Sequence, residues 1–200
     1  MQISNSILMK RASESLKGQW PIAIITFLIF GLLISAPQMS NDNSGFSMFS
    51  IITLFISGPL YLGAAFFSLA ISRGKVAKIE QLFDGFHHFK VSFIAYLLVA
   101  IFTILWMLLL IIPGIIAAIS YSMTFYIIAD NKSIDAMEAI EKSKEMMYGH
   151  KWDYFFLCLR FFGLGLLCIL TLGIGFLWLV PYVNVTTAKF YDTLLENETV

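Results

Sequence analysis

Long apolar runs separated by short polar segments dominate the pattern along the chain. A membrane-spanning helix needs about 20 consecutive apolar residues. Six stretches approach this length: 20–36, 46–72, 91–112, 113–130, 152–170 and 173–191. The third and fourth are separated only by Pro113-Gly114, a pair that favours a turn. The pattern therefore predicts an all-α, polytopic membrane protein, with six transmembrane helices in a single domain over residues 1–200.

The composition supports lipid as the solvent. The chain is 58% hydrophobic and 13% charged, with a mean hydropathy of +0.81. Soluble domains carry about 25% charged residues, so a soluble chain of this composition would lack the polar side chains to cover its surface. The formal net charge is zero and no basic patch is present, which predicts no nucleic-acid partner.

The cations lie in segments that all fall on one side of the six-span arrangement. The three opposite connections, around Asn41, Pro113 and Leu172, carry no Lys or Arg. The positive-inside rule then places both termini in the cytoplasm. The cations on that side are Lys10, Arg11, Lys17, Arg73, Lys75, Lys78, Lys90, Lys132, Lys142, Lys144, Lys151 and Lys189.

A similar pattern recurs three times. The amphipathic stretches SESLKGQW, IEQLFDGFHHF and KSKEMMYGHKW each contain a glycine before an aromatic residue, and each precedes a pair of apolar stretches. The later part of each pair contains a proline, which we expect to kink its helix because it removes a backbone donor. Two interpretations stay open: three repeated hairpins, or six spans with interfacial helices. The prolines are Pro59, Pro113 and Pro181.

The segment SIDAMEAIEKSKEMMYG predicts an amphipathic helix on the cytoplasmic side. Ser133 is a plausible N-cap, and Ala136, Ile140, Ser143 and Met147 fall on one face. From residue 130 to 153 there are six acids against four lysines, so we expect no strong recruitment of anionic lipid. The helix is either a structural belt or a docking surface for a cytoplasmic partner.

Arg160 is the one cation inside an apolar stretch. A charge at the centre of a spanning helix costs about 2.5–3.5 kcal/mol on insertion scales. We expect Arg160 to snorkel toward the cytoplasmic face, to contact an anion or lipid headgroup, or to form an ion pair. Asp153, two turns earlier, lies on roughly the same face of the predicted helix.

Two further groups of polar residues are candidate sites for ligand binding or helix packing. Asn184, Thr186 and Thr187 follow Pro181, where their side chains can bond across helices or to the carbonyl freed by the proline, or line a solute path.

The other group lies in the fourth stretch. Tyr121 accompanies a face of small residues, Tyr126 follows it, and Asp130 is expected to end the helix near Lys132 or Lys189.

No pattern of catalytic or metal-binding residues is visible, and the sequence predicts neither an enzyme nor a cofactor. The motifs G-x-S-x-G and H-E-x-x-H and a P-loop are absent. His87, His88 and His150 have no further ligands at metal-binding spacing. Cys158 and Cys168 would lie about 15 Å apart along a helix, which is too far for a disulfide.

Long segments of the chain resemble a known family. They are LIIPGIIAAISYSMTFYIIADN, AIEKSKEMMYGHKWDYF and TLGIGFLWLVPYVNVTTAKFYDTL, together with KRASESLKGQW near the N-terminus. They are similar to a bacterial family of six-span integral membrane proteins that is catalogued as a domain of unknown function. The matching positions are Pro113, Gly114, Tyr121, Tyr126, Asp130, Ser143, Gly149, Lys151, Gly173, Gly175, Trp178, Pro181, Tyr182, Phe190 and Tyr191.

The resemblance implies a multi-pass protein of the bacterial cytoplasmic membrane, often from Gram-positive species. The family is distantly similar to the membrane region of some glycerophosphodiester phosphodiesterases, whose catalytic domain this chain lacks. No catalytic residues are assigned in the family, so none can be carried over. Arg160 stands where the family pattern favours a small or apolar residue.

Two functions follow as hypotheses. The first is a non-enzymatic membrane module that supports or binds another protein in envelope maintenance or stress. The second is a small transporter or flippase, with a path lined by kinked helices. A lipid-modifying enzyme would require Asp130, His150 and Lys151 to converge. The expected partners are the lipid bilayer, another protein or a second copy of the chain. A water-filled cavity reaching Arg160 and Asn184 would favour the transporter.

Overall fold

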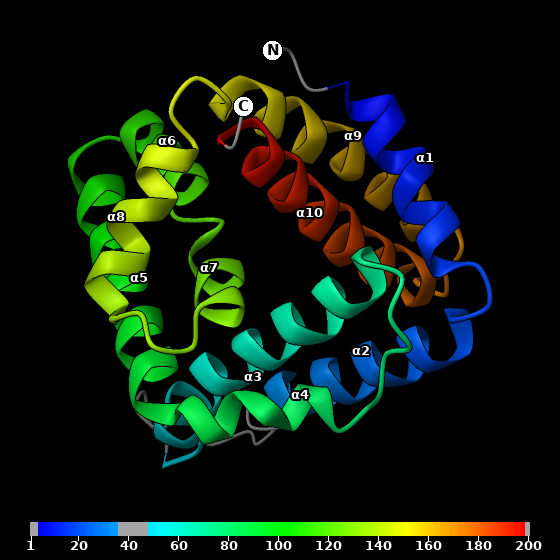
Figure 1. The fold of residues 1–200 in the computed structure, drawn as a ribbon, viewed down its shortest axis with the longest axis horizontal. Helices are drawn as coiled ribbons and strands as arrows, with labels where there is room; N and C mark the ends of the chain where they lie inside the picture. Colours follow the sequence, from blue (N-terminus) through cyan, green and yellow to red (C-terminus); the bar gives the residue numbers. More distant parts are fainter. Residues whose placement is uncertain (1–3, 36–47, 199–200) are drawn as a thin grey trace.

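The computed structural model describes residues 4–35 and 48–198, and all regular structure within them is helical (Figure 1). The elements are α1 (Asn5–Leu16), α2 (Trp20–Ser35), α3 (Met48–Ser72), α4 (Gln81–Asp84), the 3-10 helix η2 (Gly85–His88), α5 (Phe89–Leu109), α6 (Ile111–Ser120), α7 (Thr124–Asp130), α8 (Ala136–Met146), α9 (Lys151–Leu170) and α10 (Phe176–Glu198).

Four helical segments are long and apolar enough to cross a membrane. The described residues contain a fifth candidate span if α1 and α2, whose axes are bent by 101° relative to each other, count as one span. The six predicted spans are therefore not confirmed. Helix α2 has 16 residues, fewer than a span requires, and α10 carries Lys189, Asp192 and Glu196 in its second half. The four segments are Ile51–Ser72, Gln81–Leu109, Ile111–Asp130 and Lys151–Leu170.

The turn between the third and fourth predicted spans lies at Leu110, three residues before the predicted position. Leu110 is extended (φ −159°, ψ 140°), and α6 begins directly after it. Pro113 lies in the first turn of α6, where its missing N–H would have no helical partner in any case. Unlike Pro59 and Pro181, which lie inside α3 and α10, Pro113 does not interrupt a helix. Gly114 is buried, and a Cβ there would lie 2.3 Å from Met107 Cγ.

The fourth predicted span is broken between α6 and α7, and a side chain from α8 bridges the break. The Ser143 hydroxyl, which is fully buried, donates to the Ser120 carbonyl at 2.7 Å. It also accepts from the Met123 N–H at 3.2 Å. An unpaired buried backbone group is costly, so Ser143 stabilises an interruption that apolar periodicity does not reveal.

Helix α8 buries the predicted face, including Ala136, Ile140 and Ser143. Its N-cap is Asp135, whose carboxylate accepts from the Met137 N–H, and not Ser133 as predicted. Because Asp135 occupies the cap position, the first turn begins two residues later than expected.

The three-part pattern is reproduced in the order of the elements but not in the geometry of its glycines. Gly18 and Gly149 have left-handed backbones (φ +82° and +84°), and each precedes a helix that begins at or next to a tryptophan. Gly85 is helical (φ −59°). A Cβ on it would lie 2.0 Å from the Pro59 carbonyl oxygen, so this glycine serves close packing against α3. The repeat stays a prediction.

Helices α3, α7 and α10 lie toward the middle of the molecule, and α1, α5 and α9 lie at its periphery (Figure 1). Of the candidate span in α3, 72% is buried, against 11% for the spans that contain α5 and α9.

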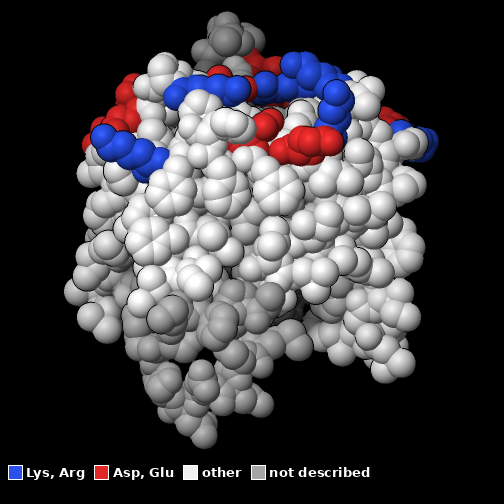
Figure 2. Space-filling model, turned by 90° about the horizontal axis from the view of Figure 1, so that it is seen from below, with Lys and Arg blue, Asp and Glu red and all other residues white. Residues whose placement is uncertain are grey.

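Charged side chains gather at one end of the visible face, and the body beneath them carries none (Figure 2). We call this end of the molecule the charged end.

Candidate functional site

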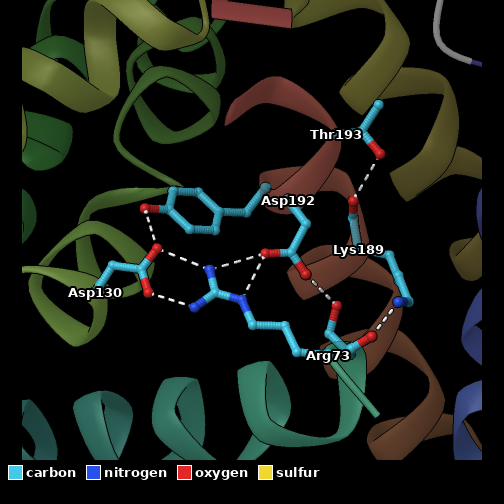
Figure 3. A network of polar contacts seen from close by, with 7 residues as sticks. Arg73, Asp130, Lys189, Asp192 and Thr193 are labelled. Carbon is cyan, nitrogen blue, oxygen red and sulfur yellow. Dashed lines mark hydrogen bonds and ion pairs between the residues drawn. The ribbon is translucent and has the colours of Figure 1, made fainter. Parts of the chain in front are cut away.

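The most connected group of polar side chains lies at the charged end, where α3, α7 and α10 meet (Figure 3). Arg73 directly follows α3, Asp130 is the last residue of α7, and Asp192 lies in α10. We call these three residues, with Ser72, Lys189 and Tyr191, the Arg73 cluster.

Arg73 and Asp130 form a two-pronged ion pair. Arg73 Nη1 donates to Asp130 Oδ1 at 2.6 Å, and Nη2 donates to Oδ2 at 2.7 Å. The planar guanidinium matches the carboxylate in this arrangement, which adds directional specificity to the charge attraction. The end of α3 is thereby fixed to the end of α7.

Asp192 uses the opposite edge of the same guanidinium. Its Oδ1 accepts from Arg73 Nε at 3.0 Å and from Nη2 at 2.9 Å. Its Oδ2 accepts from the Ser72 hydroxyl. An arginine has five N–H donors. Arg73 makes four hydrogen bonds to the carboxylates of Asp130 and Asp192. Arg73 therefore has little capacity left for a ligand.

Two further side chains complete the cluster. The Tyr191 hydroxyl donates to Asp130 Oδ2 at 3.1 Å, and the Tyr191 ring stacks on Tyr126 with centroids 5.8 Å apart. Lys189 Nζ donates to the Ser72 carbonyl at the C-terminal end of α3, where a cation is favoured by the helix dipole.

The cluster balances two cations against two carboxylates in a partly shielded place. The side chains of Arg73, Asp130 and Asp192 are 33%, 28% and 18% exposed. Hydrogen bonding to Asp130 is the largest cause that raises the pKa of Arg73 above its ordinary value, so this guanidinium keeps its charge. The arrangement joins helices and offers no free nucleophile or base.

Two cavities flank the Arg73 cluster. One, of about 270 Å³, is lined by residues that include Phe66, Arg73 and Lys132. The other, of about 390 Å³, is lined by residues that include Arg11, Lys189 and Glu196. Arg73 lines both cavities.

The predicted site residues reach this place only in part. Asp130 ends α7 and is in the cluster, where its ion-pair partner is Arg73. The Tyr126 ring stacks on Tyr191, and the Tyr126 hydroxyl donates to the Asn184 carbonyl at 3.3 Å. Tyr121 lies apart from the cluster, packed near Phe102.

The candidate residues Asn184 and Thr187, which follow Pro181, hydrogen-bond within α10. The Asn184 amide donates to the Val180 carbonyl, and the Thr187 hydroxyl donates to the Val183 carbonyl. Such bonds to the residue four positions earlier satisfy the side chains without a ligand.

Arg160 lies on the exposed face of α9. It forms no ion pair within residues 4–35 and 48–198. His150 faces Asp153 at 3.3 Å, so Asp130 and His150 are engaged in separate contacts. Among the described residues, no three His, Cys, Asp or Glu side chains come together as a metal site would require.

Sequence reasoning missed Arg73 and Asp192 as members of a site, because Arg73 was interpreted only as a charge that defines topology and Asp192 was not singled out. A signal was present: a cation and two acids stand at or near the ends of three predicted spans on the same side. Their adjacency depends on which helices are neighbours, and hydropathy does not contain that information.

The comparison with known families identifies the class of protein. The chain matches DUF975, described as "Protein of unknown function", over residues 1–120 and 103–198. It belongs to this family. No curated protein and no solved structure matches the chain.

Proposed function

We propose that the protein is a non-enzymatic module of the bacterial cytoplasmic membrane, which supports or binds another protein in envelope maintenance or stress. The charged end faces the cytoplasm with both termini, as the positive-inside rule favours.

The saturated Arg73 cluster carries this proposal. A transport path between α3, α7 and α10 would pass the place where Arg73 ties the three helices together through four short contacts. The side chains of Asn184 and Thr187 likewise donate hydrogen bonds to backbone carbonyls of α10. Arg160 and Asn184 line neither cavity beside Arg73. These features favour a rigid scaffold over a moving carrier.

The outer face of α8 and the turn after it is the surface we assign to the partner. Met137 is 44% exposed and Tyr148 is 84% exposed, and they stand among exposed charged residues such as Glu138, Glu141 and Lys142. Aromatic and methionine side chains inside a charged rim are typical of protein interfaces. The buried face of the same helix is held by Ser143, so the surface is presented on a fixed element.

The test is site-specific photo-crosslinking in the native membrane. A photo-reactive phenylalanine analogue is placed at Tyr148, at Met137, or at Leu166, which is 52% exposed on α9 away from the charged end. We expect one discrete protein adduct from Tyr148 and Met137 and none from Leu166. The adduct should weaken when Glu138 and Glu141 are both changed to Lys. Equal adducts from all three positions, or none, would contradict the proposal.

A transporter or flippase is the second candidate, because two cavities share Arg73 in their lining. Proteoliposomes that contain labelled phospholipid test this directly. If the protein is a non-enzymatic module, we expect no lipid scrambling and no solute release above that of protein-free vesicles. Transport by the wild-type protein that changes in Arg73→Ala would replace the module with a transporter gated at Arg73.

A further inference from the structure

A crevice remains on the side of the molecule away from the Arg73 cluster. It has a volume of about 240 Å³ and is bounded by α5, α6, α8 and the first residue of α9. Residues that line it are Trp106, Pro113, Ile116, Tyr121, Lys144 and Lys151. None of them belongs to the Arg73 cluster.

Two lysines from different helices line this one crevice. Lys144 lies near the end of α8, and Lys151 begins α9. Within the described parts of the chain, neither forms an ion pair with an Asp or Glu. Two unpaired cations beside one hollow favour an anion there, and lysine ammonium groups are common phosphate binders.

The remainder of the crevice suits hydrocarbon. Trp106, Pro113 and Ile116 contribute apolar surface, and Trp106 and Ile116 are 46% and 45% exposed. From Pro113 to Ser120 the wall follows α6 for about 10 Å. The crevice therefore offers two positive charges and an apolar channel alongside them.

The back of the crevice is rigid. Ala117, Tyr121 and Ile140 form a small core with Phe102. Ser143 fixes α8 to the end of α6 by bonding the Ser120 carbonyl. The position of Lys144 relative to α6 is thus set before any ligand arrives, which lowers the ordering cost of binding.

We propose that this crevice is a binding site for an anionic phospholipid. The lipid phosphate lies between Lys144 and Lys151, and the first part of one acyl chain follows α6 past Ile116 toward Trp106. Pockets that enclose drug-sized ligands measure about 300–1,000 Å³. A crevice of 240 Å³ would therefore hold only part of a lipid, with the rest in the bilayer.

This inference differs from recruitment by net charge. The segment from residue 130 to 153 carries more acids than lysines, which argues against a diffuse attraction to anionic membranes. Two of those lysines, Lys144 and Lys151, line the crevice beside its apolar surface. Binding should then depend on Lys144 and Lys151 individually, and not on the sum of charges.

Native mass spectrometry of the detergent-purified full chain tests the proposal. Phosphatidylglycerol, phosphatidylcholine and inorganic phosphate are each titrated against wild type, Lys144→Gln/Lys151→Gln and Lys90→Gln/Lys142→Gln. The second double variant is the matched control, because it removes two exposed lysines that do not line the crevice.

We expect a one-to-one phosphatidylglycerol adduct that is about tenfold stronger than that of phosphatidylcholine. Lys144→Gln/Lys151→Gln should weaken it about 25-fold, fivefold for each lysine, whereas the control should retain it. Equal binding of the two lipids, or equal loss in both double variants, would overturn the proposal. Binding of inorganic phosphate with comparable strength would show an anion site without a lipid role and would overturn it too.

A second measurement does not depend on the lysine variants folding. Phosphatidylglycerol brominated on its acyl chain should quench the fluorescence contributed by Trp106, defined as the difference between wild type and Trp106→Phe. Brominated phosphatidylcholine at the same fraction should quench this contribution much less. Identical quenching by the two lipids would mean that Trp106 merely faces the bulk bilayer, and the site would be rejected.

Discussion

Helices α3 and α5 are both long and apolar, yet they occupy opposite environments. The α3 span is 72% buried, whereas the span that contains α5 is the more hydrophobic of the two and only 11% buried. The residues of α5 that remain exposed are large, such as Leu108 at 85% and Leu109 at 69%. Of these two helices, the more hydrophobic one is therefore at the periphery and the less hydrophobic one is central.

Small residues account for the central place of α3. A Cβ on Gly63 would lie 1.8 Å from the Leu82 carbonyl oxygen, and one on Gly58 would lie 2.6 Å from the Ser92 carbonyl oxygen. The backbones of α4 and α5 therefore contact α3 directly. Lipid is as apolar as leucine, so helices in a bilayer associate through close packing and not through hydrophobicity. Hydropathy identifies a span, and small residues identify its neighbours.

The sharpest way to break this comparison is to add one methyl group to each kind of helix. Gly63→Ala should destabilise the protein by about 3 kcal/mol or more, because the methyl meets backbone that cannot move aside. Gly163→Ala in α9 has nothing within 4 Å of its new Cβ and should be neutral or slightly stabilising. Reversible unfolding in mixed detergent micelles measures both, and equal effects would refute the central role of α3.

The second-largest difference in stability between the central and peripheral helices should come from removal of a cation. Arg73→Ala leaves Asp130 and Asp192 without their partner and should cost about 2 kcal/mol, less than a fully buried pair because the cluster is partly exposed. Arg160→Ala on the exposed face of α9 should change stability by less than about 0.5 kcal/mol. The same unfolding assay compares them, and a larger loss at Arg160 would show that α9 has a partner in the folded protein.

Loss of a hydroxyl gives a smaller contrast. Ser143→Ala leaves the Ser120 carbonyl and the Met123 N–H without their bridge and should cost about 1.5 kcal/mol. Thr103→Val in α5 removes a buried hydroxyl that has no partner among the described residues and should be neutral or stabilising. Hydrogen exchange at the α6–α7 break should rise in Ser143→Ala alone; unchanged exchange there would argue against the bridge.

The smallest expected effect concerns the phenol of Tyr191. Tyr191→Phe removes the hydrogen bond to Asp130 and should cost about 1 kcal/mol. Tyr96→Phe in α5 should cost less, because Tyr96 contributes ring stacking with Tyr61. In an Asp130→Asn background the Tyr191 effect should shrink, and a double-mutant cycle measures this coupling. A coupling of zero would mean that Tyr191 acts through its ring only.

Several features of the fold could be predicted from the sequence. The long apolar helices, the gathering of charged residues and the buried face of α8 follow from local composition and periodicity. The count of six spans is not confirmed by the described residues. Helix α2 is short, α10 mixes apolar and charged residues, and the turn predicted at Pro113 occurs at Leu110.

Of the Arg73 cluster, only Asp130 was predicted from the sequence as a candidate site residue; the candidate Tyr126 lies beside the cluster, stacked on Tyr191. Arg73 contacts Asp130 from 57 positions away along the chain and Asp192 from 119 positions away. Such pairs depend on which helices are neighbours, and a single sequence does not state this. Tyr121 was singled out for helix packing, and it does pack beside Phe102 while also lining the crevice with Lys144.

The sequence by itself indicated that several helices are long and apolar enough to cross a membrane, and it predicts on which side the cations lie, because hydropathy and charge belong to each residue wherever it is placed. Only the tertiary structure decided that α3 is central, that Ser143 bridges a broken helix and that Arg73 joins α3 to α7 and α10. Each of these results from contacts between residues far apart in the chain, where backbone proximity and the pairing of polar groups are settled only when the helices pack.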